Sequence, residues 1–338
     1  MVERKESLRV APRRGLLAAL VLWPGFLWTG RAFPQSKKTP VLVGWLNSGS
    51  AQGSGHLLVA FKEALAALGW KEGEQVTFEI RWAEGRIDRL QSMATELAEK
   101  RAAIIVAGQL QAVRAATKAA PRTPIVMTTG SDPVATGLVT SLAHPGGMIT
   151  GLTNQMVDIS EKYVELLLEA MPQLQRVGFL ADSTTLARTT YMETARRSAK
   201  QSSIDVRFAE ARNVQEVEAA LSRFAQERVQ ALVLFPGPSL GADRRRIVEL
   251  ALAHRWPLMG FSREWAKEGA LLTYGPDFVT NNRRAAFYVD RILKGANPGD
   301  LPIEQPTKFE LVVNLKTANT LGITMPQSLR ARADELIQ

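Results

Sequence analysis

The sequence predicts an α/β protein made of two doubly wound, parallel-sheet lobes joined by a hinge. From residue 40 onward, short apolar segments alternate with amphipathic segments of helical length. Continuous apolar strands that alternate with helices are typical of parallel sheets covered by helices. The alternation runs through twice, with a break at Pro145-Gly146-Gly147. The chain has 338 residues, of which 46% are hydrophobic, and this length favours two domains over one.

The first run of the alternation extends from Val41 to Leu152. Its apolar segments predict strands at 41–46, 76–82, 103–107, 125–128 and 149–152. Between them we expect a helix that follows the glycine-rich loop 47–55 and ends near Leu68, and further helices at 87–100 and 109–120. Such a set forms one lobe with helices on both faces of its sheet.

The second run begins after the hinge and repeats the same order. We expect helices at 160–170, 185–201, 214–227 and 243–254, and strands at 177–180, 205–209, 231–235 and 257–261. The tail adds a strand at 271–274, a helix at 281–293 and a proline-rich connection at 298–306. We therefore expect a first lobe of residues 40–152 plus 268–300 and a second lobe of residues 153–267 plus 301–338.

Residues 1–32 have the pattern of a signal peptide. The first 14 residues are basic, and an apolar stretch follows from Gly15 to Trp28, which is too short to span a bilayer. Gly30-Arg31-Ala32 then offers a cleavage site flanked by small residues, so Phe33 is the expected first mature residue. No cysteine follows, which excludes a lipid-anchored lipoprotein. We expect a protein that is exported to the periplasm.

The composition excludes several kinds of site. The chain has no cysteine, so disulfides, thiolate nucleophiles and zinc–thiolate centres are excluded. Its three histidines, His56, His144 and His254, stand in no metal-ligand motif. Residues 1–32 carry +4 of the formal net charge of +9, the remaining +5 is spread along the chain, and no nucleic-acid-binding motif accompanies it. We expect no cofactor, no metal and no nucleic-acid partner.

Polar and aromatic side chains cluster where the predicted strands end. Ligands of doubly wound sheets bind outside the carboxyl ends of the strands, and two lobes can bring those ends together across a cleft. Hydroxyls, carboxylates and aromatic faces suit a zwitterion such as an amino acid. Ser48, Ser50, Glu84, Asp132 and Tyr274 are the preferred candidates from the first lobe, and Asp182 and Glu264 from the second. The full set of expected ligand-binding residues also includes Trp82, Gln109, Ser131, Arg263 and Asp277. Several of these, including Ser50, Asp132 and Asp182, stand equally well as helix N-caps.

Two motifs point to enzymes. Gly237-Pro238-Ser239-Leu240-Gly241 matches the G-x-S-x-G elbow of hydrolases, between a predicted strand and a predicted helix. The hydrolase elbow requires an acid and then a histidine later in the chain. Asp243 and His254 would lie about 16 Å apart along one helix at 1.5 Å per residue, so they could not touch. The glycine-rich turn after the first strand lacks the G-x-G-x-x-G order of dinucleotide-binding proteins. We therefore expect no catalytic residues and interpret Ser239 as a turn or capping residue.

Longer segments resemble a known family. They include Arg81-Trp82-Ala83-Glu84-Gly85-Arg86, Asp132-Pro133-Val134, Ile149-Thr150-Gly151, Arg291-Ile292-Leu293-Lys294-Gly295, and the stretch 306–318 that begins Pro-Thr-Lys-Phe-Glu-Leu. With these residues the chain resembles the periplasmic substrate-binding proteins of ABC transporters, in the family that includes tryptophan- and tyrosine-binding members. The likeness covers nearly all of the expected mature chain.

The resemblance implies a type I periplasmic-binding fold with a hinged cleft. It also implies a small-molecule ligand, an ABC permease and a cytoplasmic ATPase as partners, and a binding protein of an importer rather than an enzyme. We expect a monomer. Two alternatives stay open from the residues alone: an exported oxidoreductase or hydrolase on a similar scaffold, and a sensor subunit that passes the ligand to a receptor. A repressor on the same fold would need a DNA-binding head where the signal peptide stands.

Overall fold

Two open sheets organise the computed structural model, which describes residues 39–154 and 156–338. Residues 39–338 group into one unit, within which each sheet forms one lobe. The predicted signal peptide and its cleavage site lie outside the described residues. None of the helices in the described ranges is long and apolar enough to cross a membrane.

The first lobe is built on a five-stranded parallel sheet in the order β2-β1-β3-β4-β5. Its strands are β1 (Val41–Asn47), β2 (Val76–Trp82), β3 (Ile104–Gly108), β4 (Ile125–Thr129) and β5 (Ile149–Gly151). β3, β4 and β5 are buried along their whole length, as apolar runs in a parallel sheet covered on both faces should be. This lobe has the doubly wound order that the sequence predicts.

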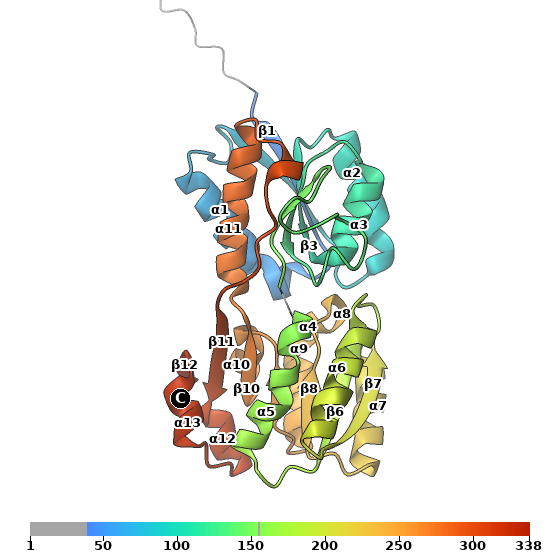
Figure 1. Cartoon of the computed structure of the whole chain (residues 1–338), viewed down its shortest axis with the longest axis vertical. Coiled ribbons are helices and arrows are strands. Elements are labelled where there is room, and N and C mark those ends of the chain that lie inside the picture. Colours follow the sequence, from blue (N-terminus) through green and yellow to red (C-terminus); the bar gives the residue numbers. More distant parts are fainter. Residues whose placement is uncertain (1–38, 155) are drawn as a thin grey trace, which may run out of the picture. The chain divides into compact units, whose positions relative to one another are not determined.

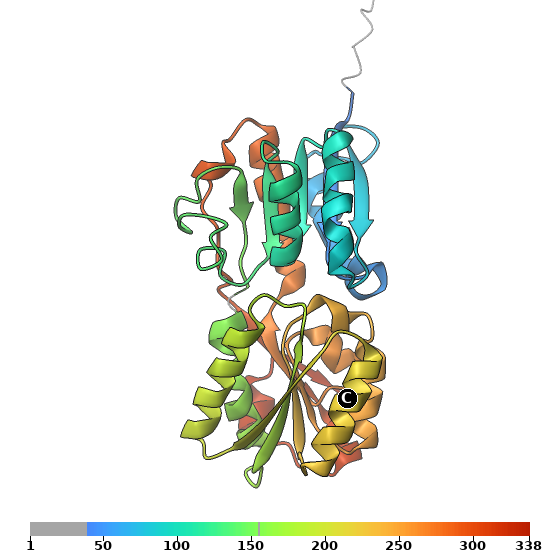
Figure 2. The ribbon, with the colours of Figure 1, turned by 90° about the vertical axis from the view of Figure 1, so that its right-hand side faces the viewer.

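Helices cover both faces of the first sheet. α1 (Ala51–Ala67) and α11 (Phe278–Leu293) lie side by side on one face (Figure 1), with Phe61 and Val289 in the core that they share with β1. η1 (Ile87–Arg89), α2 (Leu90–Glu99) and α3 (Gln109–Ala119) belong to the other face (Figure 2), where Leu97 and Val113 are buried. α11 comes from the C-terminal part of the chain, so the first lobe is assembled from two separate segments.

The second lobe has seven strands in the order β12-β11-β10-β9-β8-β6-β7. They are β6 (Arg176–Asp182), β7 (Asp205–Ala211), β8 (Ala231–Leu234), β9 (Leu258–Gly260), β10 (Leu272–Pro276), β11 (Phe309–Asn314) and β12 (Glu335–Ile337). β11 pairs antiparallel to β10 and parallel to β12, so these two edge strands run against the other five. The lobe is therefore a mixed sheet with a parallel centre.

Helices also cover both faces of this second sheet (Figures 1 and 2). One core contains Tyr163 and Ala195, and the other contains Phe224 and Val248. The helices of this lobe are α4 (Met156–Ile159), α5 (Glu161–Ala170), α6 (Arg188–Gln201), α7 (Val214–Gln226), α8 (Pro238–Gly241), α9 (Arg244–Ala253), α10 (Arg263–Glu268), α12 (Leu315–Leu321) and α13 (Gln327–Arg332). The 3₁₀ turn η2 (Pro298–Asp300) packs against β5 of the first lobe.

The assignment of residues 268–276 to the first lobe is wrong. β10 lies in the second sheet, where it pairs with β9 on one side and β11 on the other. The chain crosses to the first lobe only at Asp277, which caps α11 by accepting hydrogen bonds from the backbone N–H and the hydroxyl of Thr280. It is still at the first lobe at Glu304, which forms a bridge with Leu152. The crossovers therefore fall between β10 and α11, and between Glu304 and β11.

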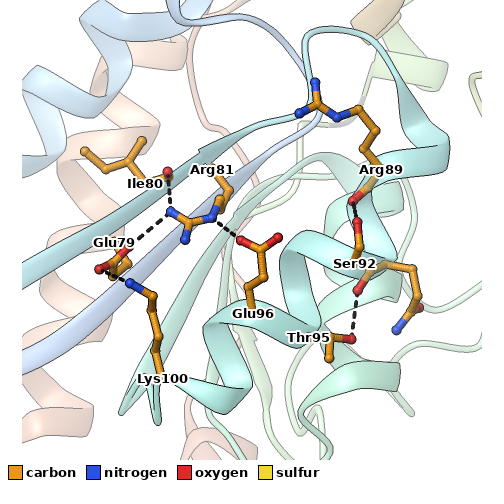
Figure 3. Close-up of polar contacts among 9 residues, drawn as sticks. Glu79, Ile80, Arg81, Arg89, Ser92, Thr95, Glu96 and Lys100 are labelled. Atoms are coloured by element: carbon orange, nitrogen blue, oxygen red, sulfur yellow. Dashed lines mark hydrogen bonds and ion pairs between the residues drawn. The ribbon is translucent and has the colours of Figure 1, made fainter.

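An ion-pair network ties α2 to the outer strand β2 (Figure 3). Arg81 donates hydrogen bonds from Nε to Glu96 at 2.8 Å and from a terminal guanidinium nitrogen to Glu79 at 3.1 Å, and Lys100 donates to Glu79 at 2.7 Å. The hydrogen bond from Lys100 is the main cause that lowers the pKa of Glu79. Exposed pairs of this kind contribute little stability individually. They show that part of the diffuse positive charge is paired at the surface.

Candidate ligand-binding cleft

Two adjoining pockets lie between the lobes, with cavity volumes of about 90 Å³ and 100 Å³. Both are lined by Gln109 and Thr129 from the first lobe, by Gly237 and Pro238 from the second, and by Phe278 at the start of α11. The residues follow the carboxyl ends of β3, β4 and β8, which is where doubly wound sheets bind ligands. We call the two pockets together the cleft.

One end of the cleft is largely apolar, and we call it the aromatic pocket. Its lining residues are Gln109, Leu110, Gln111, Thr129, Gly130, Ser131, Asn154, Thr185, Leu186, Ala187, Tyr191, Pro236, Gly237, Pro238, Phe261 and Phe278. Ser131 lies at its edge and donates a hydrogen bond to Asn154 at 3.0 Å, while its oxygen is 2.9 Å from the hydroxyl of Tyr191. None of the lining side chains is charged, and the aromatic rings of Tyr191, Phe261 and Phe278 favour an aromatic moiety.

The other end carries hydroxyls and charged groups, and we call it the polar pocket. Gly49, Ser50, Gly53 and Ser54 line it at the start of α1, together with Thr128 at the end of β4. Ser50 caps α1 by accepting a hydrogen bond from the backbone N–H of Gly53 at 3.0 Å. The first turn of α1 contains no acidic residue. Because the N-terminus of a helix carries partial positive charge, this end of the cleft favours carboxylates, and Glu84 already supplies one to the backbone N–H of Ala51 at 3.3 Å.

Gln109 lies at the centre of the cleft in an unusual backbone conformation. Its φ of 70° is left-handed, although it is not a glycine, and such conformations concentrate at ligand-binding sites. Its backbone N–H donates to the hydroxyl of Thr129 at 3.3 Å. Its side-chain oxygen is buried and has no hydrogen-bond partner among the described residues. A buried acceptor without a partner is costly, so this atom is suited to a donor group on a ligand.

Glu264 and His56 meet across the cleft. The Nε2 atom of His56, on α1 of the first lobe, lies 3.2 Å from an Oε atom of Glu264, on α10 of the second. Burial raises the pKa of Glu264, but hydrogen bonds from His56, Ser262 and the backbone outweigh burial and lower the pKa from 4.5 to about 2. Glu264 is therefore an ionised carboxylate that lines the polar pocket.

Asp182 is fully buried beneath the cleft instead of lining it. One carboxylate oxygen accepts hydrogen bonds from the backbone N–H and the hydroxyl of Thr184, at 2.8 and 2.6 Å. The other accepts from the backbone N–H of Ser239 at 2.6 Å. Burial is the main cause that raises the pKa of Asp182, against the lowering effect of these bonds. Asp182 braces the turn that contains Gly237 and Ser239.

The other predicted residues divide into three groups. Ser50, Gln109, Ser131 and Glu264 line the cleft. Asp132, Arg263 and Asp277 line neighbouring pockets, and each already has a partner within the protein. Asp132 accepts a hydrogen bond from the backbone N–H of Ala135, and Asp277 caps α11. Arg263 forms ion pairs with Glu310 and Glu335. Ser48, Trp82, Glu84 and Tyr274 line none of these pockets. Trp82 and Tyr274 pack onto Trp45 and Phe309, Glu84 accepts from the backbone N–H of Ala51, and Ser48 is buried.

Sequence reasoning missed the aromatic side chains of the cleft. Phe261 directly follows β9, and Phe278 directly follows the Asp277 cap of α11. The predicted strand 257–261 includes Phe261, whereas β9 ends at Gly260, so the rule that ligands bind after strand ends passes over Phe261. His56 was missed because it lies on a helix, and only the opposite lobe brings it to Glu264.

The hydrolase interpretation of Gly237–Gly241 finds no support in the geometry. The Ser239 hydroxyl lies 3.1 Å from the hydroxyl of Thr184 and donates to the backbone carbonyl of Gly85 at 3.1 Å. Neither partner is a general base. Within the described ranges, no group of three His, Asp or Glu residues is placed to hold a metal ion.

Comparisons with known proteins agree with this geometry. A family model described as ABC transporter substrate binding protein matches residues 53–337. A tyrosine-binding protein from Clostridioides difficile (strain R20291) is 26% identical over 264 residues, which cover 78% of this chain and 75% of that protein.

Solved structures show the same fold. A conserved domain protein from Vibrio cholerae has a TM-score of 0.83 at 25% identity, over 88% of this chain and 100% of that one. An ABC domain from Streptococcus pneumoniae in complex with L-Trp has a TM-score of 0.82 at 22% identity, with the same coverage. The curated relative and the family model describe proteins that bind substrates, not enzymes. The family model matches this chain along most of its length, and the chain has two α/β lobes with a cleft between them. The chain therefore belongs to the family of ABC transporter substrate-binding proteins and has a type I periplasmic-binding fold.

Proposed function

We propose that this protein is the exported binding component of an ABC importer and that it holds an aromatic amino acid, unchanged, in the cleft. The observation that carries this proposal is the continuity of the two pockets. The aromatic pocket, whose side chains carry no charge, includes Tyr191, and the polar pocket includes hydroxyls and the carboxylate of Glu264, while Phe261 and Phe278 line both. An aromatic zwitterion has the same two halves, and each half matches one pocket.

The two charged groups of an amino acid have complementary groups in the polar pocket. The start of α1, with Ser50 and Ser54, suits the carboxylate. The ionised Glu264 and the unpartnered side-chain oxygen of Gln109 suit the ammonium. Both lobes contribute to the cleft, so a ligand held there favours the arrangement in which the lobes meet. Ser131, at the edge of the aromatic pocket, is proposed to contact the aromatic side chain.

The relatives support the same ligand class. One binds tyrosine by its name, and a solved relative contains L-Trp. In this proposal the lobes close around the ligand, and the closed form is recognised by a permease that works with a cytoplasmic ATPase. The basic, then apolar, sequence of residues 1–32 supports export through a cleaved signal peptide.

Isothermal titration calorimetry with L-Trp and L-Tyr tests the proposal, with two analogues of L-Trp as probes. Tryptamine lacks the carboxylate and indole-3-propionate lacks the ammonium. A hydrogen bond to a charged group contributes about 1.5–3 kcal/mol, so each analogue should bind about 10- to 150-fold more weakly than L-Trp. In Glu264→Gln, the Kd values of L-Trp and indole-3-propionate should differ by a smaller factor than in the parent protein.

Three results would contradict parts of this proposal. If neither L-Trp nor L-Tyr bound at millimolar concentration, the ligand class would be wrong. If indole-3-propionate bound as tightly as L-Trp, Glu264 and Gln109 would not receive an ammonium. Equal binding of tryptamine would remove the role of the α1 N-terminus.

A further inference from the structure

The G-x-S-x-G segment makes a contact between the lobes through Ser239, which lines neither pocket of the cleft. Ser239 lies on the second lobe, and its hydroxyl donates to the backbone carbonyl of Gly85 on the first. Gly85 has a φ of 74°, and its own N–H donates to the carbonyl of Ser48 at the end of β1. An added Cβ at Gly85 would lie 3.0 Å from the Cα of Ser239. The two backbones therefore approach closely at this point.

A second contact joins the same two regions. The side chain of Gln111, on α3 of the first lobe, donates to the backbone carbonyl of Thr184 at 2.9 Å. The hydroxyl of Thr184 is 3.1 Å from that of Ser239. We call Gly85, Gln111, Thr184 and Ser239 the interlobe clasp.

The buried Asp182 holds the second-lobe half of the clasp in place. It accepts hydrogen bonds from the N–H and hydroxyl of Thr184 and from the N–H of Ser239, so both clasp residues are fixed to one carboxylate. Its side chain is fully buried. The strand that ends at Asp182 is β6, an internal strand that pairs with β8 on one side and β7 on the other, so the clasp is anchored to the second sheet.

We propose that Asp182 and Ser239 are positioning residues that set the affinity for ligand through the interlobe clasp, without touching the ligand. The clasp stabilises the arrangement in which the lobes meet. A ligand that binds this arrangement then has a lower Kd, since its apparent affinity scales with the fraction of the protein that is competent to bind. The affinity readout rests on the proposed ligand class, whereas the effect on lobe closure does not.

Ser239→Ala removes the hydroxyl and keeps the backbone N–H that Asp182 binds. A hydrogen bond contributes about 0.5–1.5 kcal/mol, so the Kd for L-Trp should rise by about three- to tenfold, mainly through faster dissociation. Ser198→Ala is the matched control. Ser198 is 8% exposed against 7% for Ser239, and its hydroxyl also donates to a backbone carbonyl at 3.1 Å, that of Glu161, but within the second lobe.

Lobe closure is measured without ligand by electron–electron double resonance between two spin labels. The chain has no cysteine, so Lys118→Cys on α3 and Glu193→Cys on α6 would be labelled specifically at two exposed positions. In the absence of ligand, Ser239→Ala should shift the distance distribution toward longer distances, and Ser198→Ala should leave it as in the parent. Asp182→Asn, which places an amide N–H₂ against bound N–H groups, should shift it further.

The outcomes separate the two proposals. A shifted distribution in Ser239→Ala without any binding of L-Trp or L-Tyr supports the clasp and overturns the proposed ligand class. A shifted distribution with a raised Kd supports both. The inference is wrong if Ser239→Ala and Ser198→Ala have the same distance distribution and, provided that L-Trp binds, the same Kd for L-Trp. The clasp would then not control lobe closure.

Discussion

Gly237 should tolerate no side chain, because Asp182 occupies the space that a Cβ would need. A Cβ built on Gly237 lies 2.0 Å from the Cβ and 2.5 Å from a carboxylate oxygen of Asp182. Asp182 cannot move aside easily, since it is fully buried and holds hydrogen bonds from Thr184 and Ser239. The φ of Gly237 is −168°, so the backbone conformation itself suits any residue. The penalty in Gly237→Ala is therefore purely steric.

Overpacking of this kind costs about 1–3 kcal/mol, and the loss of Asp182 geometry adds to it. We expect urea unfolding to show a free energy of unfolding that is lower by about 2–4 kcal/mol. Gly241→Ala is the matched control from the same motif, because an added Cβ there meets nothing within 4 Å. It should be neutral or stabilise by up to about 1 kcal/mol. Equal stability of the two variants would refute the argument that Asp182 fills the site behind Gly237.

Three other outcomes follow from individual side chains. Glu264 should stay ionised in the folded chain down to about pH 2 but protonate near pH 4.5 when unfolded. Its ionised carboxylate therefore stabilises the fold above pH 4.5, and this stabilisation is lost as the pH falls toward 2. Between pH 5 and pH 3 the free energy of unfolding, measured with urea, should fall by about 2 kcal/mol less in Glu264→Gln than in the parent protein. Phe278→Ala should raise the Kd for L-Trp about tenfold in calorimetry, whereas Phe287→Ala, on the same helix but outside the cleft, should not. Tyr288→Phe should lower the free energy of unfolding by about 1 kcal/mol, because the hydroxyl donates to the carbonyl of Pro302 at 2.8 Å.

The alternation of strands and helices was enough to predict the centres of both sheets. Strand β2 matches its prediction, and β1, β3 and β4 differ by a residue or two. The tail was harder, because strand order is a property of long-range pairing and not of local pattern. Leu272–Pro276 was given to the first lobe as the strand before α11, but its partners in the structure are β9 and the antiparallel β11. No local signal distinguishes these partners.

The candidate site was predicted in position but not in detail. Strand ends located Ser50, Gln109, Ser131 and Glu264, which line the cleft. The same rule selected Arg263, which pairs instead with Glu310 and Glu335 on β11 and β12. Those strands come from the tail, whose course the sequence left open. A charged residue after a strand can therefore be a ligand contact or a brace, and only its tertiary partners distinguish the two.

The central claim is that the cleft holds an aromatic amino acid without changing it. The most direct measurement is equilibrium dialysis of the purified protein against L-Trp or L-Tyr, followed by mass spectrometry of the compound released on denaturation. We predict one equivalent of the amino acid per chain, recovered with its original mass. Recovery of an altered compound, or of none, would contradict this account.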